Sequence, residues 1–215
     1  MADVKISELT ALTSPSGGEE LVVNASGTTK KITITNATSA SLPKAGGTMT
    51  GNLATAGISA VTAGTSNFVA GVNAGNSIVS GGNYNTVVGD EAGTAITTGD
   101  RNSAVGMSAL VANTTGSFNA ALGYESLKAN TTGGQNTGLG DRTLLANTTG
   151  ALNTAVGQGS LAANTTASNN VAVGVAALEA NTTGTENVAV GASALTDNTT
   201  NGYNTAVGFE SLKVN

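Results

Sequence analysis

The residues best suited to acid–base chemistry are two pairs of adjacent carboxylates, Glu19-Glu20 and Asp90-Glu91. Two carboxylates can hydrolyse a glycosidic bond when they flank it, one as acid and the other as base or nucleophile. Neighbours along an extended segment point to opposite faces, so neither pair converges on one bond. The first pair also falls at an expected turn and the second at a variable position of a repeat. We therefore expect no catalytic role for either pair.

Other reaction chemistries lack their essential residues. The chain contains no cysteine and no histidine. This removes thiol nucleophiles, imidazole bases, disulfides and the commonest zinc ligands. No Gly-Lys-Ser or Gly-Lys-Thr sequence is present that could form a phosphate-binding loop. The sequence predicts a protein that is not an enzyme and that has no catalytic, cofactor-binding or metal-binding residues.

A 17-residue repeat fills the chain from Asn85 to Asn215. Each copy opens with a five-residue box, Asn-Thr-Ala-Val-Gly in its clearest form, and we number the repeat from 1 at the box asparagine to 17. Position 9 is leucine in copies two to eight, and Asn-Thr-Thr begins at position 12 in copies two to seven. The box asparagines are Asn85, Asn102, Asn119, Asn136, Asn153, Asn170, Asn187 and Asn204. A fixed period with a constant apolar position predicts a solenoid of stacked coils rather than a disordered chain.

The box predicts how one coil is built. In an extended segment, positions 2 and 4 share one face and position 3 points the other way. Because position 4 is always Val or Leu, we expect it to face the interior together with the leucine at position 9. Glycine at position 5 permits a corner. The segment that carries the leucine is expected to be a second strand, with a single helical turn as the alternative.

Repeated asparagines at positions 1 and 12 are expected to stack in amide ladders along the rod. The Asn-Thr-Thr triplets, and Asn24 and Asn36, also match the N-glycosylation pattern. The start of the sequence lacks the basic and apolar regions of a secretory signal. We therefore favour ladders over glycosylation.

One coil cannot be stable alone. Burying one Val and one Leu stabilises by roughly 3–6 kcal/mol, whereas ordering 17 backbone units costs roughly 17–34 kcal/mol. The coils must therefore share backbone hydrogen bonds with their neighbours and apolar contacts with other chains. The predicted fold is all-β: a homotrimeric fibrous rod of stacked coils, a parallel β-roll or β-solenoid, with a small N-terminal β-rich domain. Eight coils would extend for about 40 Å at about 4.8 Å per strand.

Three regions follow from the patterns. Residues 1–38 are expected to form the β-rich domain, with a strand around Val4 and Ile6 and a hairpin of which Leu21-Val22-Val23 and residues 31–35 are the strands. Residues 39–84 form a connector rich in Gly and Ala. Its sequence Asn67-Phe68-Val69-Ala70-Gly71 nearly repeats the box, which indicates irregular first coils, with a flexible linker as the alternative. Residues 85–215 form the eight repeats.

Two stretches near the N-terminus carry a resemblance to a known class. Lys5-Ile6-Ser7-Glu8-Leu9, with Gly17 to Val23 and Thr28 to Thr33, resembles the N-terminal segment of bacteriophage tail-fibre and related virion proteins. Leu42-Pro43-Lys44-Ala45-Gly46-Gly47-Thr48-Met49-Thr50-Gly51-Asn52-Leu53 resembles a short motif that recurs in phage tail-fibre shafts. The resemblance implies a homotrimer in the virion, fastened to tail or capsid proteins by its N-terminal segment.

The repeats carry a second resemblance. Their Ala-Val-Gly boxes are similar to those in the heads of trimeric autotransporter adhesins, which are left-handed parallel β-rolls assembled as trimers. The adhesin period is usually shorter, and the adhesin signal peptide and membrane anchor have no counterpart in this sequence. The expected function is that of a structural virion protein, a tail or side fibre that serves as a rigid spacer or host-adhesion element. The alternatives are a capsid decoration or cement protein and a bacterial trimeric adhesin.

Charge and surface residues indicate the partners. The net charge of −5 arises in the repeats, which predicts repulsion from nucleic acid and from anionic membranes. No stretch approaches the roughly 20 apolar residues that span a bilayer. Tyr124, Arg142 and Phe209 lie at the variable positions 6 and 7 and are expected on the outside, as contacts for a host receptor or as inert surface. Another protein is expected at the C-terminal end, where the last coil would expose unpaired backbone groups.

Overall fold

The computed structural model describes residues 20–25, 28–33, 58–59 and 64–213. The chain divides into two compact units, Met1–Leu53 and Ala54–Asn215. Within the first, β1 (Glu20–Ala25) and β2 (Thr28–Thr33) form an antiparallel hairpin. This confirms the predicted hairpin. The strand predicted around residues 4–6 and the motif at residues 42–53 lie outside the described residues.

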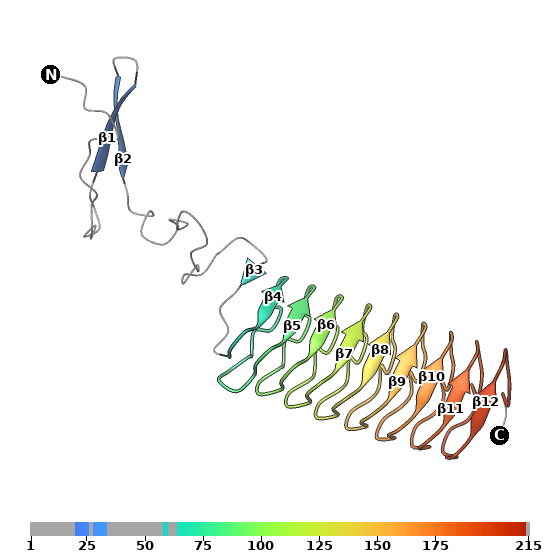
Figure 1. The fold of residues 1–215 in the computed structure, drawn as a ribbon. Helices are drawn as coiled ribbons and strands as arrows, with labels where there is room; N and C mark the ends of the chain where they lie inside the picture. Colours follow the sequence, from blue (N-terminus) through green and yellow to red (C-terminus); the bar gives the residue numbers. More distant parts are fainter. Residues whose placement is uncertain (1–19, 26–27, 34–57, 60–63, 214–215) are drawn as a thin grey trace. The chain divides into compact units, whose positions relative to one another are not determined.

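The second unit contains one sheet whose strands follow the order of the chain from β3 to β12 (Figure 1). Short β3 (Ile58–Ser59) runs antiparallel to β4 (Phe68–Ala70), and every later neighbour pair is parallel. The later strands are β5 (Thr86–Val88), β6 (Ser103–Val105), β7 (Ala120–Leu122), β8 (Thr137–Leu139), β9 (Thr154–Val156), β10 (Val171–Val173), β11 (Val188–Val190) and β12 (Thr205–Val207). From β5 on, each residue pairs with the residue 17 positions further along. The described residues are therefore all-β without helices, and the strands from β4 to β12 form a parallel solenoid.

Each coil contains only one strand, at positions 2–4, so the prediction of a second strand around the leucine is wrong. Positions 7 and 9 both have left-handed backbone, as in Glu125 (φ 54°) and Leu127 (φ 54°). A strand or a helical turn requires negative φ at every residue, so this segment is neither. Left-handed non-glycine residues are strained, but hydrogen bonds to the neighbouring coils offset the strain. The Glu125 N–H donates to the Met107 carbonyl (3.0 Å) and the Leu127 N–H to the Thr143 carbonyl (2.9 Å).

The glycine at position 5 is required by its backbone. Its φ lies between 112° and 143° in every coil from Gly71 to Gly208. A Cβ added to Gly106 would collide with the carbonyl oxygen of Gly123 in the next coil. Any other residue would therefore be strained and would push the coils apart.

The interior is lined by position 3, not by position 4 as predicted. Position 3 is at most 2% exposed in every strand from Val69 to Ala206 for which an exposure is given, whereas Leu122 at position 4 is 51% exposed. The coil is too narrow for large side chains at both position 3 and position 9. In the one coil with glycine at position 3, a Cβ on Gly138 would lie 2.6 Å from Ser126 Oγ. Alternation gives each strand two faces. Because the leucines at position 9, from Leu110 to Leu195, are fully buried and already fill much of the interior, only the face with the smaller side chains, that of position 3, fits inside.

The first coils fill the same interior with a different set of residues. Later coils place Ala, or Gly in one coil, at position 3, Leu at position 9 and Asn at position 12, whereas the coil from Asn85 has Val87, Gly93 and Ile96. A Cβ on Gly93 would lie 2.7 Å from Ile96 Cδ1 and 3.1 Å from Val87 Cγ1, so the two larger residues occupy the space of the missing leucine. The preceding coil repeats this exchange with Val69, Gly75 and Ile78. Residues 67–84 thus form an irregular first coil, as predicted, and the flexible-linker alternative is wrong there.

Candidate interaction surface

Two asparagine ladders hold the coils in register, as the sequence predicts. At position 1, Asn136 Nδ2 donates to the Gly150 carbonyl of its own coil (2.8 Å), and Asn136 Oδ1 accepts the backbone N–H of Asn153 (3.1 Å). At position 12, Asn147 Nδ2 donates to Asn130 Oδ1 (2.8 Å) and to the same Gly150 carbonyl (3.0 Å). Both ladders are buried through most of the solenoid. They therefore fix the sheet and the turns of each coil to one another and give the outer surface a constant spacing.

Among the described residues, the position-12 ladder ends at Asn198. Asn198 Oδ1 is buried and has no hydrogen-bond partner among the described residues. In earlier coils this oxygen accepts Nδ2 of the asparagine 17 residues further on, as Asn147 does from Asn164. The sequence places Asn215 at that spacing from Asn198, outside the described residues. A protein bound at this end stays a prediction.

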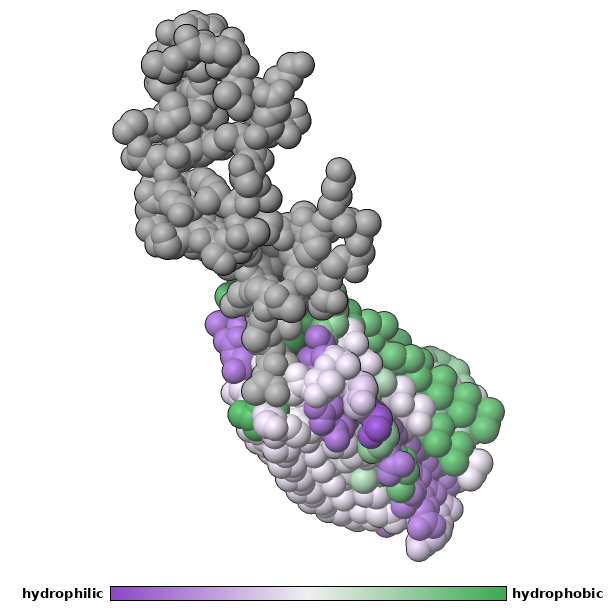
Figure 2. Space-filling view, turned by 60° about the vertical axis from the view of Figure 1, so that its left-hand side comes forward, coloured by the Kyte–Doolittle hydropathy of each residue, from purple (hydrophilic) through white to green (hydrophobic). Residues whose placement is uncertain are grey.

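One side of the solenoid is apolar. Positions 2 and 4 are the outward residues of each strand, position 17 precedes them and position 6 follows; we call these four positions the apolar face, with positions 17 and 6 as its margins. Among the described residues, every large hydrophobic residue that is strongly exposed belongs to this face, apart from Val79 and Leu212. They are Phe68, Val72, Tyr84, Met107, Phe118, Leu122, Leu139, Leu152, Val175, Val190, Tyr203, Val207 and Phe209. Figure 2 shows hydrophobic side chains gathered in a band along the solenoid.

At position 17, the planar side chains of three consecutive coils are stacked. The Arg101 guanidinium lies 5.3 Å from the centre of the Tyr84 ring and 5.2 Å from that of Phe118, which is a cation–π arrangement on both sides. The ion pairs within residues 64–213 join Lys128, Arg142 and Lys213 to glutamates and do not include Arg101. Arg101 therefore keeps an unpaired positive charge on one margin.

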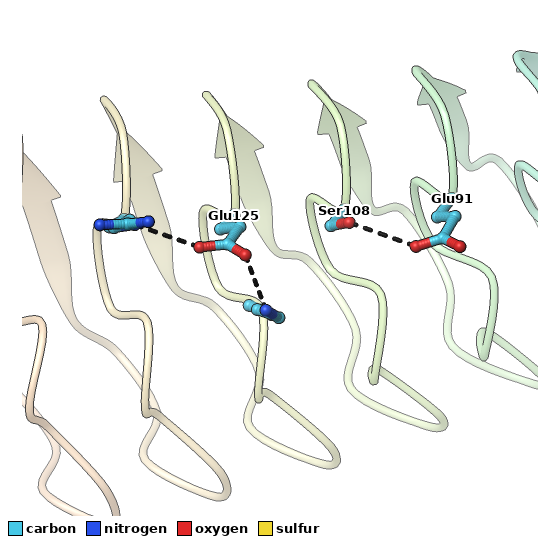
Figure 3. A network of polar contacts seen from close by, with 5 residues as sticks. Glu91, Ser108 and Glu125 are labelled. Atoms are coloured by element: carbon cyan, nitrogen blue, oxygen red, sulfur yellow. Dashed lines mark hydrogen bonds and ion pairs between the residues drawn. The ribbon is translucent and has the colours of Figure 1, made fainter.

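Two of the three predicted contact residues come together. The Arg142 guanidinium lies 5.6 Å from the centre of the Tyr124 ring, and Arg142 Nε donates to Glu125 Oε2 (3.1 Å). Lys128 Nζ pairs with Glu125 Oε1 (2.7 Å), so one carboxylate joins two cations from neighbouring coils (Figure 3). Phe209 lies in the same position-6 row as Tyr124 but five coils further on, and it is 76% exposed. Host contact by these residues stays a prediction.

The Glu125 cluster changes the acidity of its members. The hydrogen bond from Lys128 lowers the pKa of the Glu125 carboxyl below its ordinary value, Arg142 lowers it further, and desolvation opposes both. Glu125 in turn raises the pKa of Lys128 and of Arg142. The cluster thus favours the charged form of all three groups and links two coils on the surface.

The acidic pair Asp90-Glu91 does not form a convergent site with other carboxylates. Glu91 Oε2 lies 3.5 Å from Ser108 Oγ of the next coil (Figure 3), and Asp90 is exposed on the position-6 margin. In the described part of the chain, no group of three or more Asp or Glu residues could hold a metal ion. Within the same residues, no helix has the length and hydropathy to cross a membrane. Glu19 lies outside the described residues.

Sequence reasoning placed the position-4 residues inside and missed the position-17 margin. The sequence nevertheless contains a signal for the inward residue of the strand and for the position-17 margin. The side chain at position 3 is never larger than that of Val, which suits a narrow interior. Aromatic residues recur at position 17, in Tyr84, Phe118 and Tyr203. These two patterns together indicate an apolar outer face.

The fold and surface define a class: a β-solenoid whose parallel strands, β4 to β12, present a face of exposed hydrophobic side chains. No protein-family model matches the chain, and neither a curated protein nor a solved structure shows significant similarity to it.

Proposed function

We propose that this chain is a structural component of a bacteriophage virion, a tail or side fibre that assembles as a homotrimer through its apolar face. Its N-terminal segment fastens the fibre to tail or capsid proteins, and its coils serve as a rigid spacer or host-adhesion element. The virion assignment is supported by the resemblance of residues 5–33 and 42–53 to phage fibre proteins. The number of chains is supported by the resemblance of residues 85–215 to trimeric proteins.

The single observation that carries the assembly is the concentration of exposed large hydrophobic residues on one face. Nine parallel strands at about 4.8 Å extend for about 40 Å, and a face three to seven residues wide measures about 10–20 Å across. The face therefore offers roughly 400–800 Å² per chain, which approaches the area per partner of a stable protein interface. An apolar band of this extent on a fully solvated monomer would favour association with other molecules.

The mass of the purified chain in solution tests the assembly. Light scattering should give three times the 20.7 kDa mass of the chain. Leu139→Glu places a charge at the centre of the face and should reduce the mass to that of a single chain. Thr149→Glu at the exposed position 14 is the matched control and should leave the trimer intact. A wild-type chain that stays monomeric at every concentration would contradict the proposal.

Labelling of phage particles tests the virion assignment. An antibody against residues 1–38, followed by electron microscopy of particles from the phage that encodes this chain, should mark the base of a tail or side fibre. Marking over the capsid shell would favour a decoration or cement protein instead. Particles without the chain would exclude both.

A further inference from the structure

The two margins of the apolar face are suited to meet each other in a closed ring of chains. Position 17 lies just before the strand and position 6 just after it, six residues apart, so each level of the solenoid presents one residue on each margin. A three-fold axis along the solenoid relates chains by rotation without translation. In such a ring, residues at the same level would face one another, and the position-17 residue of one chain would meet the position-6 residue of the next.

The residues at equal levels are compatible along the whole solenoid. Aromatic residues oppose aromatic residues in the pairs Phe118 with Tyr124 and Tyr203 with Phe209, and such pairs are favourable beyond their buried area. Gln135 faces Asp141, where an amide can donate to a carboxylate. The remaining pairs are Ser66 with Val72, Tyr84 with Asp90, Arg101 with Met107, Leu152 with Gln158, Asn169 with Val175 and Glu186 with Ala192. No level brings two like charges together.

Charge supports the same arrangement. Arg101 has no carboxylate partner among the described residues of its own chain, although it is stacked between two rings. Asp90 is exposed on the opposite margin, one coil before the level of Arg101. Across the contact between chains, the guanidinium can reach this carboxylate diagonally. The two charges that are unpaired in one chain thus become partners in the ring.

A second copy of this chain is the occupant that fits the face best. The surface repeats at the spacing of the coils, and only a partner with the same spacing stays in phase over successive levels. A peptide or a globular partner would match one or two levels and leave the rest of the band exposed to water. Another copy matches every level.

We propose that neighbouring chains join margin to margin, with position 17 of one chain against position 6 of the next at the same level. This contact rests on the homotrimer proposed above. The contact is heterologous, so three equivalent contacts close the ring. Phe118, Tyr124, Tyr203 and Phe209 are its aromatic anchors.

Cysteine cross-linking tests this contact directly, because the natural chain contains no cysteine. The variant Gln135→Cys/Asp141→Cys places one thiol on each margin at the same level. Within one chain the strand Thr137–Leu139 separates the two sites, and its three extended residues alone span about 10 Å, whereas a disulfide needs Cα atoms within about 7 Å. Oxidation should therefore link chains only to each other and should give a covalent trimer on a non-reducing gel. Leu152→Cys/Gln158→Cys should give the same band from a different coil.

Three control variants distinguish the proposed margin contact from other arrangements of the chains. Gln135→Cys alone and Asp141→Cys alone should remain uncross-linked, whereas covalent dimers from either would indicate a two-fold contact and overturn the proposal. Gln135→Cys/Val175→Cys offsets the thiols by two coils and should not cross-link. Light scattering of each reduced variant separates the two hypotheses: a trimer that fails to cross-link refutes the margin contact alone, and a monomer refutes the proposed assembly as well.

Discussion

Replacing a ladder asparagine by alanine should destabilise the solenoid far more than the size of the change suggests. Asn136→Ala removes the Nδ2 bond to the Gly150 carbonyl and the two bonds that Asn136 Oδ1 accepts from Asn153, one from its backbone N–H and one from its Nδ2 (3.2 Å). Gly150 keeps its bond from Asn147, and Asn153 Nδ2 keeps its bond to Ala167. The Asn153 N–H is left buried without a partner.

The magnitude follows from these partners. A buried donor without an acceptor costs about 1–3 kcal/mol, and each of the other two lost bonds contributes about 1 kcal/mol. The expected loss in the free energy of unfolding is therefore about 3–5 kcal/mol. Asn136→Asp keeps the acceptor but directs a buried carboxylate at the Gly150 carbonyl, so it should destabilise at least as much. The matched control is Thr149→Ala, at an exposed position of the same coil, with an expected change below about 0.5 kcal/mol.

Urea unfolding followed by circular dichroism measures the total effect, and hydrogen exchange of the Asn153 amide measures the local one. Exchange at Asn153 should accelerate by about a hundredfold or more relative to wild type, since 1.4 kcal/mol corresponds to a factor of ten. The amide of Asn204, three coils from Asn153, should change least, because each coil contacts only its neighbours. If Asn136→Ala and Thr149→Ala unfolded at the same urea concentration, the ladders would not contribute to stability and this reasoning would be refuted.

Three further substitutions test the interior and the surface cluster. Leu144→Ala, at a fully buried position, should lower the free energy of unfolding by about 2–5 kcal/mol in urea titrations, and a loss below 1 kcal/mol would contradict the packing. Gly138→Ala should destabilise by about 1–3 kcal/mol because its Cβ would lie 2.7 Å from Thr143 Oγ1, and adding Thr143→Ala should restore part of the loss. Because the pKa of Glu125 is lowered on folding from its ordinary 4.5, its stabilisation is present above pH 4.5 and is lost as the pH falls through the lower folded value. The melting temperatures of wild type and Glu125→Gln should therefore differ at pH 7 and converge in acid.

The period and the ladders could be predicted from the sequence because both depend on strict recurrence. A buried asparagine at position 1 or 12 finds all the hydrogen-bond partners of its side-chain amide only when each neighbouring coil repeats its own. The spacing of the asparagines therefore predicted both the solenoid and the ladders. Recurrence also revealed the irregular first coil at Asn67, one residue out of phase. These features require no knowledge of how the chain turns between positions 5 and 17.

The orientation of the strand and the path of the turns could not be predicted in the same way. Alternation places Leu122 and Ala121 on opposite faces of the strand but does not say which of them faces inward. Hydrophobicity favoured Leu122, which is wrong, because this criterion ignores the volume that the position-9 leucine already occupies. The left-handed backbone of Leu127 was also unexpected, since leucine rarely adopts it. Both outcomes depend on neighbouring coils, whose carbonyl groups and side chains a single repeat does not specify. The pairing of Tyr124 with Arg142 likewise joins different coils.

The uniform 17-residue register also makes the length of this solenoid adjustable in discrete steps. Deleting residues 119–135 would join Phe118 directly to Asn136, and every ladder and strand bond would find an equivalent partner in the coil that moves up. The solenoid would be shorter by one strand spacing, about 4.8 Å, with its face and margins still in phase. Duplication of one unit would lengthen it by the same amount, so reach can change by whole coils without any redesign of the core.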